Sequence, residues 1–206
     1  MFTKTILAVS IALTGMTLLA TPTAVAASER PTFISIGSEA RPPIGWVQFC
    51  NDNARECDAG TGGARDVVLN AKAWSDLVRI NRWANDNIKP VTDLEHWGVV
   101  ERWDLPKDGY GDCEDYVLLK RQMLMKAGWP RSALLVTVVR DKKSDGHAVL
   151  TVKTDKGEFV LDNQNESVVL WQESGYRFVK RQSQTNQNAW VALGDPPPAT
   201  TTASAR

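Results

Sequence analysis

The chain has 206 residues, with 24 basic and 24 acidic side chains and a formal net charge of zero at pH 7. This balance argues against nucleic acid as a partner, because nucleic-acid-binding domains carry an excess of basic residues on one surface. Residues 27–206, which exclude a candidate leader segment, are enough for one domain with a sizeable core.

The first 26 residues have the pattern of a secretory signal peptide. Lys4 precedes an apolar run from Ile6 to Ala20, and Ala24-Val25-Ala26 supplies a small-x-small end. The run is short and rich in threonine for a membrane span, although an uncleaved anchor is the alternative. We therefore expect a periplasmic protein that is cleaved after Ala26 and has no membrane span after processing.

The three cysteines fit an exported protein. Cys50 and Cys57 lie in a polar segment, and such a pair outside the cytoplasm is most simply a disulfide. Residues 27–63 are then predicted to be an irregular arm that the disulfide pins. Cys113 is left over, and an odd cysteine in an exported protein is either an intermolecular partner or a free thiol.

Helical periodicity begins at about Ala64, and apolar residues recur at three- and four-residue steps as far as Ile88. Residues 90–111 form a long connection, and a loop of that length in a compact domain is usually functional. It holds His96, for which the sequence names no partner. It also holds Trp103 and Tyr110, for which simple packing is favoured over a functional role, such as lining a cleft or steadying an oxyanion. A second helix is predicted over 113–127, with Asp112 as its cap.

The period then changes to two, which indicates strands. The expected strands cover 133–140, 147–154 and 158–163, with two more at 176–182 and 188–193. Helices followed by an antiparallel meander predict an α+β fold. The low-complexity tail, 194–206, is predicted to be disordered, which leaves 27–193 as the folded domain.

The chemistry of the chain centres on the stretch GYGDCEDY, at 109–116. Cys113 begins a predicted helix, where the helix dipole favours a thiolate, but Asp112, Glu114 and Asp115 oppose the thiolate by their charge. His147 begins a strand and Asp162 ends the next one, so nucleophile, base and orienting carboxylate follow in order. Each residue alone has a simpler interpretation, as a buried cysteine, a surface histidine and a turn-forming aspartate.

The turn between these two strands presents a geometric difficulty. If Lys156-Gly157 were its central residues, Asp162 would lie opposite Thr151, roughly 13 Å along the strand from His147. Contact between His147 and Asp162 therefore requires a register centred nearer Thr154-Asp155, or a bulge.

Three stretches, GYGDCEDYVLLKRQML, DGHAVLTV and FVLDNQ, resemble the bacterial transglutaminase-like cysteine proteinases of the LapG periplasmic type, and DLEHWGVVERWDLP and GWVQFCNDNAREC extend the resemblance over about 43–193. The resemblance implies a papain-like, transglutaminase-like core in which the nucleophile helix packs on an antiparallel sheet. It implies Cys113 as nucleophile, His147 as general base and Asp162 as orienter. Acids beside the nucleophile bind calcium in this type, and the matching positions are Asp112 and Glu114.

These observations predict an exported thiol peptidase that cleaves a protein substrate through a thioester. By resemblance the substrate would be a surface adhesin, and a membrane receptor would sequester the protease. Acyl transfer by a transglutaminase or amidase at the same triad is one alternative, and a non-catalytic calcium-binding interaction module is another. A calcium ion or an imidazolium at His147 would offset the charge that opposes the Cys113 thiolate.

Overall fold

The computed structural model describes Met1, residues 33–58 and residues 63–194. The candidate signal peptide, the start of the arm and the C-terminal tail from residue 195 lie outside the described residues. Within the described ranges, no helix has both the length and the apolar character needed to cross a membrane.

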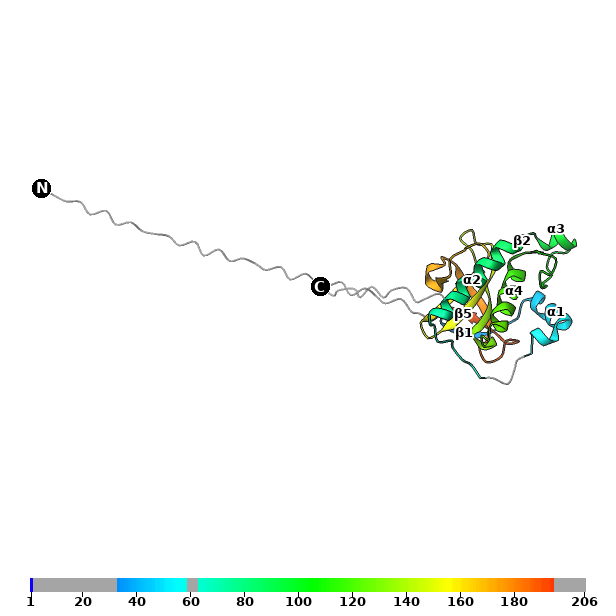
Figure 1. Ribbon diagram of the computed structural model, residues 1–206, viewed down its shortest axis with the longest axis horizontal. Coiled ribbons are helices and arrows are strands. Elements are labelled where there is room, and N and C mark those ends of the chain that lie inside the picture. Colours follow the sequence, from blue (N-terminus) through cyan, green and yellow to red (C-terminus); the bar gives the residue numbers. More distant parts are fainter. Residues whose placement is uncertain (2–32, 59–62, 195–206) are drawn as a thin grey trace.

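A seven-stranded sheet, antiparallel at every pairing, forms the centre of the domain (Figure 1). Its strand order is β1-β9-β8-β4-β5-β6-β7. The five expected strands are present, and two more, β1 and β7, extend the sheet at its edges. The strands are β1 (Ile36–Ala40), β4 (Leu134–Arg140), β5 (Gly146–Thr154), β6 (Gly157–Leu161), β7 (Val169–Leu170), β8 (Arg177–Gln182) and β9 (Trp190–Leu193).

Two helices, α2 (Ala71–Asn87) and α4 (Cys113–Lys126), pack side by side on one face of this sheet (Figure 1). Their apolar residues and the alternate residues of β4, β5 and β6 form the main core. Together with the α4–β5 packing, this arrangement confirms the predicted α+β fold with the nucleophile helix on an antiparallel sheet. Core members from both helices and the sheet include Leu77, Ile80, Val117, Leu118, Leu124, Val136, Leu150 and Leu161.

Helix α2 begins later than the periodicity predicted. The side chain of Asn70 accepts a hydrogen bond from the N–H of Ala73 at 2.9 Å, so it caps the helix and fixes the start at Ala71. Before it the chain is extended, and Val67 bridges to Thr154 of β5 in a parallel arrangement. The apolar residues before Asn70 thus belong to an extended segment that crosses the end of the sheet.

The N-terminal arm is more regular than expected. Besides β1 it contains α1 (Ile44–Asp52) and a short 3-10 helix, η1 (Ala54–Glu56), so the prediction of an irregular arm is wrong for these residues. Trp46 and Phe49 are each 2% exposed and hold α1 to the core, which gives this short helix its tertiary support. The predicted disulfide between Cys50 and Cys57 is present.

The connection between α2 and α4 also has structure. It includes a parallel pair of short strands, β2 (Lys89–Pro90) and β3 (Tyr110–Gly111), and the short helix α3 (Asp93–Trp97). The hydroxyl of Tyr116 on α4 donates to the carbonyl of Ile88 at the end of α2, at 2.6 Å. The start of α4 is therefore tied to the end of α2, and this fixes where Cys113 lies.

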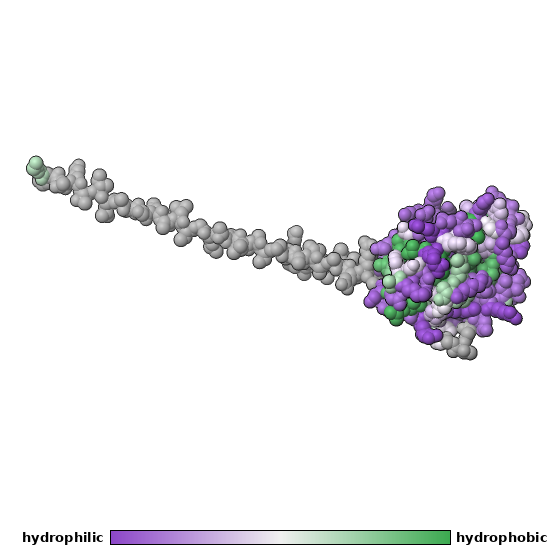
Figure 2. Space-filling model, viewed as in Figure 1, coloured by the Kyte–Doolittle hydropathy of each residue, from purple (hydrophilic) through white to green (hydrophobic). Residues whose placement is uncertain are grey.

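The face of the domain drawn in Figure 2 is mainly hydrophilic, with hydrophobic patches between the hydrophilic residues. Trp103, one of the aromatic residues of the connection, does not belong to the exposed surface. Its ring is 6% exposed and packs edge-on against Trp46 at 6.4 Å between centroids, and its Nε1 donates to Glu101 at 2.7 Å. Packing was the favoured prediction for Trp103, and it is confirmed.

This packing depends on a glycine in α1. A Cβ at Gly45 would lie 2.2 Å from Cδ1 of Trp103, whereas a Cβ at Gly63 would meet nothing within 4 Å. We expect Gly45→Ala to lower the free energy of unfolding by about 1–3 kcal/mol, because the buried indole must move. Urea unfolding measures this difference. Gly63→Ala is the control and should stay close to wild type, and equal midpoints for the two variants would contradict the packing argument.

Candidate active site

Cys113 is the first residue of α4, as predicted, and its thiol is partly buried. Its Sγ donates to Oε2 of Glu114 at 3.1 Å. Burial raises the pKa of Cys113 well above its ordinary value, and the negative charges of Glu114 and Asp112 add to this effect. The backbone N–H of Ala148 acts in the opposite direction and lowers the pKa. Because Ala148 follows His147, the thiol lies beside the start of β5.

His147 and Asp162 contact each other, which the sequence hypothesis required. Nε2 of His147 lies 2.8 Å from Oδ1 of Asp162, and both residues are buried. The strands pair Thr154 with Gly157 and Leu150 with Leu161. The turn is therefore centred on Asp155-Lys156, one residue earlier than the Lys156-Gly157 signal indicated. This shift brings Asp162 alongside Val149, on the same face as His147 and within side-chain reach of it.

Asp162 is held as an ionised carboxylate. Burial would raise its pKa, but hydrogen bonds from His147, Tyr176 and the N–H of Gln164 outweigh burial and lower the pKa. The hydroxyl of Tyr176 donates to Oδ2 at 2.5 Å, and the N–H of Gln164 donates to Oδ1 at 3.1 Å. Burial and the nearby charge of Asp162 raise the pKa of Tyr176, so the phenol remains a donor.

The imidazole of His147 is fixed on several sides. With Asp162 ionised, Nε2 of the ring carries the hydrogen and donates it, which leaves Nδ1 as the acceptor nitrogen. Nε2 of the Gln164 side chain lies 3.5 Å from this Nδ1, and the Tyr176 ring meets the imidazole edge-on at 5.6 Å between centroids. The sequence analysis named neither Gln164 nor Tyr176, since nothing local marks them as neighbours of a histidine.

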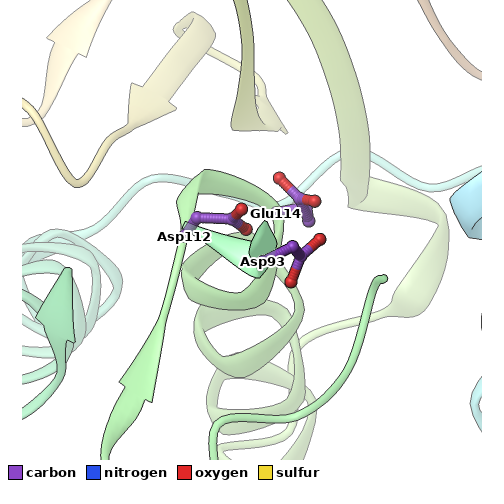
Figure 3. Close-up of side chains that lie close together, drawn as sticks. All are labelled: Asp93, Asp112 and Glu114. Carbon is purple, nitrogen blue, oxygen red and sulfur yellow. The ribbon is translucent and has the colours of Figure 1, made fainter. Parts of the chain in front are cut away.

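Three carboxylates gather at the first turn of α4, and Figure 3 shows their side chains close together. Oxygen atoms of Asp93, Asp112 and Glu114 all lie within 4.8 Å of one another. Asp112 stands at the N-cap position of α4, but its side chain accepts no hydrogen bond from the helix, so the predicted capping role is wrong. Within the described part of the chain, its Oδ1 is buried without a hydrogen-bond partner.

The pKa values of the acids around Cys113 are raised, because burial and mutual repulsion disfavour their ionised forms. Burial and the charge of Asp112 raise the pKa of Glu114 to about 9, and burial raises the pKa of Asp115 to about 8. Burial, with the charges of Asp93 and Glu101, also raises the pKa of Asp112. Calcium accepts several carboxylate oxygens, and an orphaned oxygen in a buried acidic cluster is what such an ion would satisfy. The chemistry of the cluster therefore fits calcium, and Asp93 is a third carboxylate in it that the sequence analysis did not name.

Other residues singled out from the sequence lie away from these contacts. Nε2 of His96 lies 2.9 Å from Oδ2 of Asp108, and its ring stacks on Trp97 at 3.9 Å between centroids. Asp108 and Trp97 are therefore the partners of His96 that the sequence did not name. Tyr110 is 42% exposed, and its ring lies 5.9 Å from that of His96 between centroids.

The family model described as bacterial transglutaminase-like cysteine proteinase BTLCP matches residues 36–197. No curated protein matches the chain. Calcium-bound LapG from Legionella pneumophila has a TM-score of 0.51 and 17% sequence identity, over 73% of this chain and 92% of that chain. LapG from the same organism, without the calcium designation, has a TM-score of 0.49 and 22% identity, over 58% of this chain and 68% of that chain. At such identities the likeness to calcium-bound LapG supports the fold alone.

The acidic cluster makes a prediction about calcium. Calcium held by Asp93, Asp112 and Glu114 should raise the thermal midpoint of the chelator-treated protein, because a ligand that binds only the folded state stabilises it. At a hundredfold excess over the dissociation constant the shift should be about 5–10 °C.

Differential scanning fluorimetry with calcium or chelator measures this shift. Asp93→Asn and Asp112→Asn should abolish the response, and Asp145→Asn, which removes an exposed charge elsewhere, should keep it. A response of the same size in all four proteins would contradict the assignment of the ligands.

Proposed function

Because the chain belongs to the bacterial transglutaminase-like cysteine proteinase family, we propose that it hydrolyses peptide bonds of a protein substrate through a thioester on Cys113. The observation that carries this proposal is the buried 2.8 Å contact between His147 and Asp162. His147 lies at the start of β5, and the N–H of the next residue, Ala148, lowers the pKa of the Cys113 thiol. Nucleophile, base and orienting carboxylate thereby come from α4, β5 and the end of β6.

The proton moves between Cys113 and His147. Nε2 of His147 donates to the ionised Asp162, so Nδ1 is the nitrogen that takes the thiol proton. Asp162 stabilises the imidazolium that forms, and Tyr176 occupies its second oxygen. Asp162 therefore serves His147 as a charged acceptor without taking the proton itself.

The thiolate then attacks the carbonyl carbon of the substrate, and the carbonyl oxygen becomes an oxyanion. The backbone N–H of Cys113 is one donor for this oxyanion, since the first N–H groups of a helix have no partner within the helix. The imidazolium of His147 gives its proton to the departing amine, which leaves an acyl thioester on Cys113. Water, deprotonated by His147, hydrolyses the thioester and restores the free thiol.

Asp93, Asp112 and Glu114 would hold a calcium ion beside the nucleophile. When bound, calcium supplies positive charge that offsets the repulsion between these carboxylates and the Cys113 thiolate. The residues themselves support this role, because Glu114 accepts a hydrogen bond from the Cys113 thiol at 3.1 Å. A carboxylate that is engaged with a cation is a weaker acceptor, and the thiol is then freer to give its proton to His147.

The location and partners of the enzyme complete the proposal. The signal-like N-terminus and the Cys50–Cys57 disulfide support a periplasmic location, because disulfides persist in oxidising compartments. The resemblance of the catalytic stretches supports an exported surface protein, such as an adhesin, as substrate, cut near small residues. It also supports a membrane receptor that sequesters the protease.

Substitution of the nucleophile tests the proposal. Cys113→Ala should lower the turnover of a cell-surface protein fraction by about a thousandfold or more, because the remaining site can only bind and polarise the substrate. His147→Ala should cost nearly as much, and the double variant no more than either one. New N-termini identified by sequencing measure the turnover.

His96→Ala is the matched control, since it removes the other histidine of the chain and should retain turnover. Equal cleavage by wild type and Cys113→Ala, with both folded by circular dichroism, would overturn the proposal. Products that carry an added primary amine in place of a free carboxyl group would instead indicate acyl transfer.

A further inference from the structure

Asp162 lies one residue beyond the end of β6, where the sheet no longer supports its main chain. Both main-chain groups of Asp162 are nevertheless bonded, and both partners come from α2. Its N–H donates to Oδ1 of Asn81 at 3.1 Å, and its carbonyl accepts from Nδ2 of Asn85 at 2.9 Å. Asn81 and Asn85 are one helical turn apart, so they face the same segment.

The same two side chains hold the segment that follows Asp162. Nδ2 of Asn81 donates to the carbonyls of Asn165 and Glu166 at 3.1 and 3.0 Å. Asn81 has a polar side chain, yet it is completely buried on the face of α2 that packs against the core. A buried amide is costly unless its hydrogen bonds are made, and those of Asn81 are made to this segment alone among the described residues.

We propose that Asn81 and Asn85 are positioning residues, which hold the 162–166 segment so that its side chains fix the His147 imidazole. This inference rests on the proposed function. The segment supplies the carboxylate at Nε2 of His147 and the Gln164 amide 3.5 Å from Nδ1, so it meets the ring at both nitrogens. Helix α2, rather than the sheet, then sets the position of Asp162 relative to His147.

An isosteric substitution separates hydrogen bonding from packing. Asn85→Asp keeps the volume of the side chain but removes the N–H that donates to Asp162. Asn87→Asp on the same helix is the matched control, because the Asn87 side chain donates to the carbonyl of Trp83 in its own helix, at 2.8 Å. Asn85 is partly exposed, so this variant is expected to fold, whereas Asn81→Ala opens a buried site and serves as a second variant.

We expect Asn85→Asp to lower kcat by about tenfold to a hundredfold, because small displacements of a catalytic group have effects of this size. KM should not change, since Asn85 does not contact the reacting atoms. In an Asp162→Ala background, which leaves no carboxylate to position, Asn85→Asp should cause no further loss. Loss of kcat in both backgrounds would indicate general damage to the fold and overturn the inference.

A spectroscopic measurement keeps this test separate from the proposed function. The chain has two histidines, so His96→Gln leaves one, and NMR of the 15N-labelled protein can follow the Nε2–H proton of His147. Its downfield, slowly exchanging signal should persist in Asn87→Asp and be lost or broadened in Asn85→Asp and Asn81→Ala. An unchanged signal in folded Asn85→Asp would overturn the inference, even if wild type has no peptidase activity. Absence of activity in wild type with loss of the signal would overturn the proposed function and leave the positioning role intact.

Discussion

The arrangement of the site depends on the cost of burying negative charge around one thiol. Asp112, Glu114 and Asp115 enter the domain with the first turn of α4, and burial raises the pKa of each of them. The N-terminus of a helix compensates such charge only in part. Asp93 adds a further carboxylate from α3 instead of a cation. A nucleophile in this setting needs positive charge from elsewhere, and the two sources available are a bound cation and an imidazolium.

The two helices on the sheet serve the site in different ways. Helix α4 carries the thiol, and its start is held by the short β2–β3 pair and by the bond from Tyr116 to the end of α2. Helix α2 carries no reacting group, but its asparagines bond the main chain at Asp162. The sheet contributes His147 at the start of β5, where β6 has already ended. The proposed reacting groups therefore lie where regular strand pairing stops, and side chains of α2 replace the missing sheet bonds at Asp162.

Much of this site was predictable from short stretches of sequence. Cys113 at a helix start, His147 at a strand start and Asp162 at a strand end follow from local periodicity and turn residues. The register between the two strands was not predictable, because Asp155-Lys156 and Lys156-Gly157 are both acceptable turns locally. In the folded chain Asp155-Lys156 is the turn: Thr154 pairs with Gly157, and its hydroxyl donates to the Gly157 carbonyl at 2.8 Å. Val67 bonds the β5 side of this turn, at Lys153 and Asp155.

The sequence by itself determined the order of the two main helices and the five predicted strands, the disulfide between Cys50 and Cys57, and the candidate thiol, imidazole and carboxylate, because each depends on residues that are neighbours or follow one period. Only the tertiary structure decided that Asp93 joins Asp112 and Glu114, that Tyr176 meets Asp162, and that Asn81 belongs to the site. These residues come from separate elements, and their polar side chains acquire partners only when burial removes water. The role of a buried asparagine in an apolar helical stripe can be recognised only when the segment that makes its hydrogen bonds is known.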